Sequence, residues 1–218
     1  MIYLDNAAMT KPSRSVIELV KITMESLWFN PSSAYKYGGI VKDCIEHAKE
    51  NVANLIGADP SEIHFTSGAT ESANILLDSL IGKNAEVYIT AVEHPCVANT
   101  GGYDVGILPV DKYGVIYPSE LPVHKDEDFD ETVLFVIAAN NEIGTIQPIK
   151  EIGDICKEHG VLFHTDAVQA YGHVRMNVNN LGVQLLSASG HKFGGPKGVG
   201  FLYVKNGVDI IPYIHGGG

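Results

Sequence analysis

The chain has 218 residues, of which 45% are hydrophobic and 19% charged, a composition that supports a packed core and excludes disordered and fibrous proteins. Fifteen basic and 26 acidic residues give a formal net charge of −11, which argues against a surface for nucleic acid or an anionic membrane. The first residues lack a signal peptide's basic and apolar regions, and no apolar run approaches the ~20 residues of a membrane span, so we expect a soluble cytoplasmic protein.

Two amphipathic helices are predicted near the N-terminus. Apolar residues recur at helical spacing from Val16 to Leu27 after Ser13, a suitable N-cap. A longer apolar stripe follows Gly38-Gly39 and ends at Gly57, a typical helix stop. Cys44 falls on this stripe, and we expect it to be a small buried residue.

Short apolar runs then alternate with helical or turn segments, and several of them are continuous rather than alternating. Continuous runs indicate strands buried on both faces, as in a sheet covered by helices on each side. The sequence therefore predicts an α/β fold, a three-layer sandwich with a mostly parallel central sheet. The acidic stretch 125–131 is expected to be a solvated loop. The predicted strands are Glu62–Thr66, Glu86–Thr90, Thr132–Ala139, Val161–Asp166, Leu185–Ser189 and Val199–Lys205.

Cysteine and histidine spacing gives no sign of a metal or a disulfide framework. Cys44, Cys96 and Cys156 are an odd number with no CxxC pair. The nine histidines include no HxxxH or HExxH pair. We therefore expect no metal site. Cys156 lies in a predicted helix, 149–159, and is expected to pack in the core.

Polar residues follow several of the predicted strands, where an open parallel sheet binds its ligands. The segment 67–72 (Ser-Gly-Ala-Thr-Glu-Ser) joins a strand to a helix and suits a phosphate, although such joints are also common as plain helix caps. Asp166 ends a buried strand, where it could cap the next helix or meet a cation. Lys192 lies beside a histidine in a glycine-rich turn. It could be a nucleophilic amine or an ordinary surface lysine.

In their order along the chain, these segments resemble the cysteine desulfurases, pyridoxal-phosphate enzymes of fold type I and the class V aminotransferase group. The resemblance extends over residues 1 to 218, and it is the ordered series rather than any single motif that is distinctive. The motifs are Tyr3-Leu4-Asp5-Asn6-Ala7-Ala8, Asn30-Pro31-Ser32-Ser33, Thr66-Ser67-Gly68-Ala69-Thr70-Glu71-Ser72, Glu93-His94, Asn140-Asn141-Glu142-Ile143-Gly144, His164-Thr165-Asp166-Ala167-Val168-Gln169, Ser189-Gly190-His191-Lys192, Gly195-Pro196-Lys197-Gly198 and His215-Gly216-Gly217-Gly218.

The resemblance implies roles for three catalytic or charged residues. Lys192 corresponds to the lysine that forms the internal aldimine with pyridoxal 5′-phosphate. Asp166 corresponds to the carboxylate that pairs with the protonated pyridine nitrogen and keeps the ring an electron sink. His94 corresponds to the histidine that stacks on the ring, and its unperturbed pKa near neutrality suits proton transfer.

Six further positions match residues that hold the cofactor. Asn141 and Gln169 match groups near its phenolic oxygen, and the other four match positions at its phosphate. A dianionic phosphate in a chain of charge −11 needs such a local donor cluster. The phosphate positions are Ala69, Thr70, Ser189 and His191.

By the same resemblance, the chain converts L-cysteine to L-alanine and transfers the sulfur to an acceptor, as in iron–sulfur cluster biogenesis, and it forms a homodimer. Residues 1–60 would be an N-terminal helical segment and residues 61–218 the cofactor-binding large domain, with the C-terminal small domain absent. The family's sulfur-accepting cysteine and carboxylate-binding arginine belong to that C-terminal part. Met9 and Phe193-Gly194 depart from the family's common residues, at positions with no catalytic role.

Alternatives remain open at this stage. Cys96, two residues after His94, could accept the sulfur, although a small residue packed behind the cofactor is the simpler interpretation. The substrate could be selenocysteine or cysteine sulfinate, as in lyases of the same group. The chain could also be a noncatalytic cofactor-binding subunit that needs a second polypeptide, and a separate sulfur-acceptor or scaffold protein is a possible partner.

Overall fold

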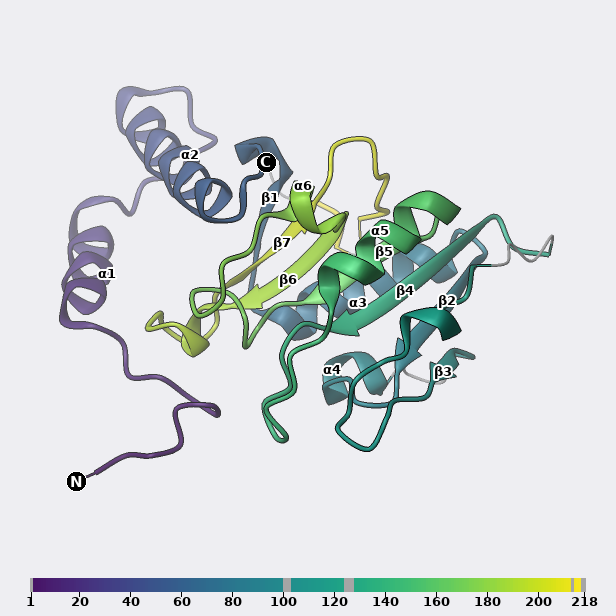
Figure 1. The fold of residues 1–218 in the computed structure, drawn as a ribbon. Coiled ribbons are helices and arrows are strands. Elements are labelled where there is room, and N and C mark those ends of the chain that lie inside the picture. The colour runs from purple at the N-terminus through teal and green to yellow at the C-terminus, as the bar shows by residue number, and fades with distance from the viewer. Residues whose placement is uncertain (1, 100–102, 124–127, 213, 217–218) are drawn as a thin grey trace.

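A twisted sheet forms the centre of the computed structural model, which describes residues 2–99, 103–123, 128–212 and 214–216 (Figure 1). Within these residues the sheet has seven strands in the order β1-β7-β6-β5-β4-β2-β3. The strands are β1 Ile63–Thr66, β2 Ala85–Thr90, β3 Gly106–Leu108, β4 Glu131–Ile137, β5 Leu162–Asp166, β6 Leu185–Ser189 and β7 Gly200–Val204. The helices are α1 Arg14–Ser26, α2 Lys36–Ile56, α3 Ala69–Ile81, α4 Pro95–Ala98, α5 Ile149–His159 and α6 Val178–Leu181, with short 3₁₀ turns η1 Pro60–Glu62, η2 Pro118–Glu120 and η3 Gly190–Lys192.

The sheet is mostly parallel, as the continuous apolar runs predicted. β6, β5, β4, β2 and β3 pair in parallel, whereas β7 runs antiparallel to both of its neighbours, β1 and β6. Because β1 and β6 are both antiparallel to β7, they run in the same direction as each other. The carboxyl ends of β1, β6, β5, β4 and β2 therefore lie at one edge of the sheet.

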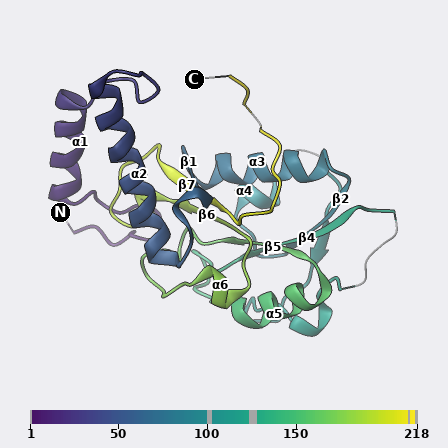
Figure 2. The same cartoon turned by 90° about the horizontal axis from the view of Figure 1, so that it is seen from above.

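Helices cover both faces of the sheet, so the predicted three layers are confirmed (Figure 2). On one face, α3 and α4 pack on a cluster that includes Leu76 and Leu80 of α3 and Phe135 of β4. On the other face, α5, α6 and the end of α2 pack on a second cluster that includes Ile152 and Phe163. Val133 and Phe135 of β4 face one cluster and Leu134 and Val136 face the other, and all four are buried, which explains the continuous hydrophobic run.

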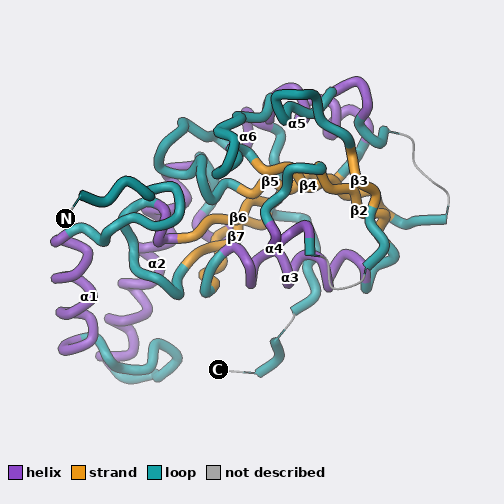
Figure 3. The backbone as a smooth tube through the Cα atoms, turned by 90° about the horizontal axis from the view of Figure 1, so that it is seen from below, coloured by secondary structure: helices purple, strands orange, loops and turns teal. Residues whose placement is uncertain are grey.

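The N-terminal helices lie at the β1–β7 end of the sheet, away from α5 (Figure 3). The Ser13 hydroxyl accepts the Val16 N–H at 3.2 Å, so the predicted N-cap of α1 is confirmed. α1 has no buried residue. α2 ends at Gly57 in the left-handed conformation (φ 70°), the predicted stop.

Three sequence-based expectations about the fold were wrong. Cys44 is exposed rather than buried: α2 buries only Gly38, Val41, Ala53 and Ile56, and the rest of its apolar stripe is half-buried or exposed. α2 also begins at Lys36, before the glycine pair. The three-residue edge strand β3 was not predicted, since it is too short to show a pattern and its Ile107 is exposed.

Other expectations were met or cannot be compared. Cys156 is buried on α5, as predicted. Residues 125–127 of the acidic stretch and the last two glycines lie outside the described residues. No helix in the described part of the chain is long and apolar enough to cross a membrane.

Candidate active site

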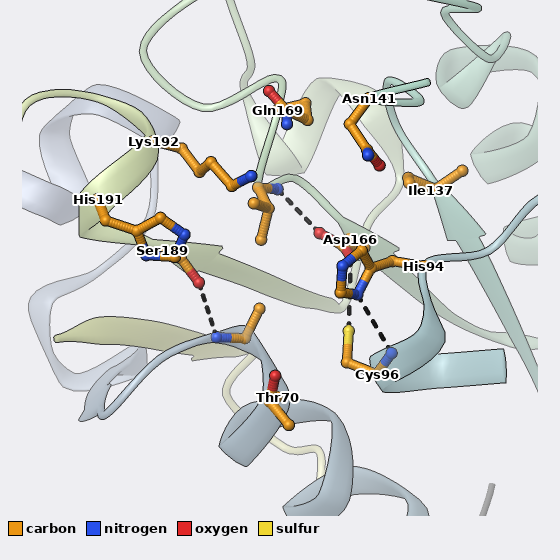
Figure 4. A pocket seen from close by; sticks show the side chains of 12 residues that line it. Thr70, His94, Cys96, Ile137, Asn141, Asp166, Gln169, Ser189, His191 and Lys192 are labelled. Carbon is orange, nitrogen blue, oxygen red and sulfur yellow. Dashed lines mark hydrogen bonds between the residues drawn. The ribbon is translucent and has the colours of Figure 1, made fainter. Parts of the chain in front are cut away.

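A pocket of about 110 Å³ opens at the carboxyl edge of the sheet, where the ends of β1, β6, β5, β4 and β2 meet (Figure 4). All nine residues that the sequence singled out line it, although they come from five separate segments of the chain. They are Ala69, Thr70, His94, Asn141, Asp166, Gln169, Ser189, His191 and Lys192; Cys96, Ile137 and Val168 complete the lining.

The first turn of α3 forms an anion-binding end of the pocket. Gly68 precedes the helix with a backbone φ of 153°, a conformation that residues other than glycine rarely adopt. The Ser189 hydroxyl accepts the Ala69 N–H at 2.9 Å, so β6 and α3 are joined at this point. The exposed Thr70 hydroxyl makes no hydrogen bond to the described part of the chain. With the free N–H groups of a helix N-terminus, these hydroxyls suit a phosphate.

Close packing beneath this turn requires a second glycine. A Cβ at Gly200, the first residue of β7, would lie 2.4 Å from the Ala188 carbonyl oxygen and 2.7 Å from the Gly68 Cα. Both contacts are with backbone, which cannot move aside cheaply. Gly200 therefore allows β7 to pass under the anion-binding turn.

Asp166 places a buried carboxylate at the floor of the pocket. The residue is 2% exposed, and its Oδ1 accepts the Val168 N–H at 2.9 Å. Burial raises the pKa of the Asp166 carboxyl above its ordinary value, and the Val168 hydrogen bond and the nearby His94 and Lys192 oppose that rise. No cationic group of the described residues lies within ion-pair distance of it. The site thus holds a buried carboxylate suited to a cationic ligand group.

Lys192 reaches into the middle of the pocket from η3. Its Nζ donates a hydrogen bond to the Ala7 carbonyl at 2.7 Å, and that carbonyl also accepts the Gln169 side-chain amide at 2.7 Å. Burial lowers the pKa of the Lys192 ammonium, while Asp166 and Asp5 oppose this shift. A lowered pKa increases the fraction of neutral amine, the form that attacks a carbonyl carbon.

The N-terminal segment fixes the turn that carries Lys192. The Thr10 hydroxyl donates to the His191 carbonyl at 2.7 Å and accepts the Gly194 N–H at 2.8 Å. The Thr10 N–H also donates to the His191 carbonyl. These three contacts join residues more than 180 positions apart in sequence, and they explain why an opening motif far from Lys192 belongs to the site.

His94 lies over Asp166 at the start of α4, with Cys96 beside it. The His94 Nδ1 accepts the Cys96 N–H at 3.2 Å, so the neutral ring carries its proton on Nε2. The Cys96 Sγ lies 4.0 Å from Asp166 Oδ2. Burial and the neighbouring Asp166 and Glu93 carboxylates raise the pKa of the Cys96 thiol to about 12. Cys96 is therefore a thiol rather than a reactive thiolate at neutral pH.

Asn141 and Gln169 occupy the rim opposite Thr70 (Figure 4). Asn140 holds the loop of Asn141: its side-chain amide donates to the Val92 carbonyl at 2.9 Å, and its oxygen accepts the Glu142 and Ile143 N–H groups. Val92 lies two residues before His94, so the two loops support each other. The amides of Asn141 and Gln169 can hydrogen-bond an oxygen at the centre of the pocket.

Sequence reasoning assigned no role to several residues of the site. Ile137 and Val168 line the pocket. The Ala7 carbonyl accepts hydrogen bonds from two pocket side chains, those of Gln169 and Lys192. Glu93 lies buried beneath the pocket. Ala7, Val168 and Glu93 are within motifs quoted above, so their positions carried a signal. Ile137 is an ordinary apolar strand residue, and its place at the pocket follows only from the end of β4.

The arrangement suits one kind of ligand. It offers hydroxyls and N–H groups to an anion at one end, a carboxylate to a cation at the floor, and an amine to a carbonyl group between them. Within the described residues, no group of three or more His, Cys, Asp or Glu side chains is placed to hold a metal ion. These pocket groups suit an organic ligand with an anionic group, a cationic group and a reactive carbonyl.

Comparison with known proteins gives matches that extend over the whole of this chain. A family model described as "Aminotransferase class-V" matches residues 2–218. The chain is 45% identical to a protein named cysteine desulfurase IscS from Methanosarcina thermophila over 99% of its own length. It resembles a solved NifS-like protein with a TM-score of 0.91 and 40% identity, covering 99% of this chain, and a structure of SspA in complex with cysteine with a TM-score of 0.89 and 35% identity, covering 100% of it.

The coverage of the relatives is much smaller. The chain spans 55% of the Methanosarcina protein, 62% of the NifS-like structure and 65% of the SspA structure. About half the length of the curated relatives thus has no counterpart in these 218 residues.

Proposed function

Because the chain belongs to the aminotransferase class-V family, whose members depend on pyridoxal 5′-phosphate, we propose that it is the cofactor-binding part of a cysteine desulfurase. The proposed reaction converts L-cysteine to L-alanine and transfers the sulfur to an acceptor. The observation that carries the proposal is the convergence of Lys192, Asp166 and the first turn of α3 on one pocket. The relatives named cysteine desulfurase and the structure with bound cysteine support the substrate.

The donor set of the pocket fits the cofactor. Its phosphate would be held at Ala69, Thr70, Ser189 and His191, and its aldehyde by the Lys192 amine. Asp166 is a buried carboxylate with no ion-pair partner among the described residues, and a protonated ring nitrogen would supply one. When bound, the cofactor supplies an electron sink for the substrate carbon next to the amino group.

The residues of the chain then have distinct tasks. Asp166 holds a negative charge at the floor and keeps the ring nitrogen protonated. A free Lys192 amine could move a proton within the pocket, and the Ala7 carbonyl, which accepts a hydrogen bond from Nζ, would hold its ammonium form. His94 presents Nε2–H to the pocket because Nδ1 is occupied by the Cys96 N–H, so it can donate a proton there.

None of the three cysteines is suited to accept the sulfur. Cys96 lies at the pocket, but its thiol pKa is raised to about 12. Cys156 is buried, with a pKa also raised to about 12 by burial. Cys44 is exposed on α2, outside the pocket lining. We propose that the accepting cysteine belongs to the portion of the relatives that has no counterpart here.

A complementation assay tests this function. The chain with pyridoxal phosphate is mixed with a polypeptide carrying the remaining C-terminal portion of a relative, and alanine and persulfide are measured with L-cysteine, selenocysteine or cysteine sulfinate. We expect cysteine-dependent alanine and persulfide only in the mixture, and we expect both to persist in Cys96→Ser.

Three outcomes would contradict parts of the proposal. Persulfide on the isolated chain, lost in Cys96→Ser, would make Cys96 the acceptor. If the mixture does not react, and L-cysteine does not change the visible absorption of the cofactor-loaded chain, then cysteine is not the substrate. A larger response to selenocysteine or cysteine sulfinate would assign the chain to the corresponding lyases.

Further parts of the proposal follow from the family. We propose a homodimer, and the exposed Ile143 and Ile146, on the loop of Asn141, offer an apolar surface beside the pocket. We also propose a cytoplasmic location, a role in supplying sulfur for iron–sulfur clusters, and a sulfur-acceptor or scaffold protein as partner. Residues 1–60 and 61–218 remain our proposed division into helical segment and cofactor-binding domain.

A further inference from the structure

Glu93 is a buried carboxyl group that the proposed reaction does not use. It lies in the turn between β2 and α4, directly before His94, and is 9% exposed. Its Oε1 accepts two hydrogen bonds, from the Thr90 hydroxyl at 2.6 Å and from the Ile137 N–H at 2.7 Å. Its Oε2 is buried and has no hydrogen-bond partner in the described structure. Oε1 thus accepts both hydrogen bonds of the carboxyl group, and Oε2 accepts none within the described structure.

Glu62 shows what a fully partnered buried glutamate looks like in the same chain. It is 8% exposed, similar to Glu93. Its Oε1 accepts the Asn206 N–H at 2.8 Å, and its Oε2 accepts the Asp59 N–H at 2.9 Å. Both oxygens of Glu62 therefore have a donor, as a buried carboxylate requires. Glu93 lacks the second donor, which disfavours its charged form.

The charges around Glu93 disfavour ionisation as well. Asp166 on β5 and Cys96 on α4 are the titratable groups whose charges interact with it. Burial, and to a lesser extent Asp166, raise the pKa of the Glu93 carboxyl to about 8, against the opposing hydrogen bonds from Thr90 and Ile137. Two neighbouring buried carboxyls seldom ionise together.

We propose that Glu93 is a positioning residue that acts as a neutral carboxylic acid, tying the turn of His94 to the end of β4 and leaving Asp166 as the charged carboxylate beneath the pocket. The connection is direct, because Glu93 immediately precedes His94 in the chain and its Oε1 accepts a hydrogen bond from the N–H of Ile137, a pocket residue. The consequence for cofactor binding rests on the proposed function, whereas the protonation state does not.

Infrared spectroscopy of the chain without added cofactor tests the protonation state. At pH 7 the wild-type spectrum should contain the C=O stretching band of a protonated carboxylic acid that is missing from Glu93→Gln. The band should disappear on raising the pH, with an apparent pKa of about 8. Glu62→Gln is the matched control and should keep the band. If wild type and Glu93→Gln differ only in a carboxylate band, the proposal is wrong.

Cofactor titration tests the positioning role. Glu93→Gln keeps an acceptor at Oε1, so its dissociation constant for pyridoxal phosphate should stay within about threefold of wild type, whereas Glu93→Ala leaves two donors unpaired and should bind at least about tenfold more weakly. Equal binding by folded Glu93→Ala would refute positioning. Equal losses in both variants would show that the negative charge is required. If wild type itself binds no cofactor, the proposed function fails while the infrared result still stands.

Discussion

Replacing Lys192 by alanine should abolish the visible absorption that the chain acquires with pyridoxal phosphate. The absorption requires covalent attachment of the cofactor aldehyde to an amine, and the Lys192 Nζ is the lysine amine lining the pocket. Burial lowers the pKa of Lys192 and so increases its neutral, nucleophilic form. The measurement is a titration of wild type and variant with the cofactor, followed by absorption spectroscopy after removal of free ligand.

Lys205→Ala is the matched control for this experiment. Lys205 follows β7, is exposed and does not line the pocket. Its replacement should leave the absorption intact. An unchanged band in Lys192→Ala would show that another amine holds the cofactor, and the assignment of Lys192 would then be wrong.

The second large effect is expected at Asp166. Asp166→Ala removes the buried carboxylate that would pair with the ring nitrogen, and loss of one partner of a buried ion pair typically costs about 3–5 kcal/mol. Because 1.4 kcal/mol is a factor of ten, the dissociation constant for pyridoxal phosphate should rise by about 100-fold or more. Any cysteine-dependent chemistry in the complementation assay should disappear with it.

The stability of Asp166 variants separates a binding role from a folding role. Asp166 is buried and forms no ion pair within the part of the chain that the structure describes, so its charge destabilises the chain while the cofactor is absent. Asp166→Asn keeps an acceptor for the Val168 N–H and should unfold in urea at the same or a higher midpoint than wild type, yet bind the cofactor weakly. Asp154→Asn, at an exposed residue of α5, should change neither property. Unchanged cofactor affinity in Asp166→Ala would refute the role of Asp166.

The central part of the fold could be predicted from sequence because both faces of its strands are buried. β4, β5 and β6 are buried along nearly their whole length, and their predicted and observed bounds agree within two residues. β3 escaped prediction because pairing with β2, rather than its own composition, makes Gly106–Leu108 a strand. Cys44 was misplaced because an apolar stripe does not say how much of it the rest of the chain covers.

The site was predictable where function constrains residue type and order along the chain. Asp166, Lys192 and His94 fall within ordered motifs, and the fold brings all nine proposed residues to one pocket. The hydrogen bonds of the Ala7 carbonyl were not predictable, since a backbone oxygen leaves no trace in residue type. Glu93 was visible only as a neighbour of His94, and its unpartnered oxygen becomes apparent only once Ile137 and Thr90 are placed around it.

Chemical trapping of the cofactor tests the central claim most directly. Wild-type chain is loaded with pyridoxal phosphate, reduced with borohydride to make any lysine attachment permanent, digested and mapped by mass spectrometry. We predict a single modified peptide that carries the cofactor on Lys192. Modification spread over exposed lysines such as Lys197 and Lys205, or none at all, would contradict a Lys192-centred cofactor site.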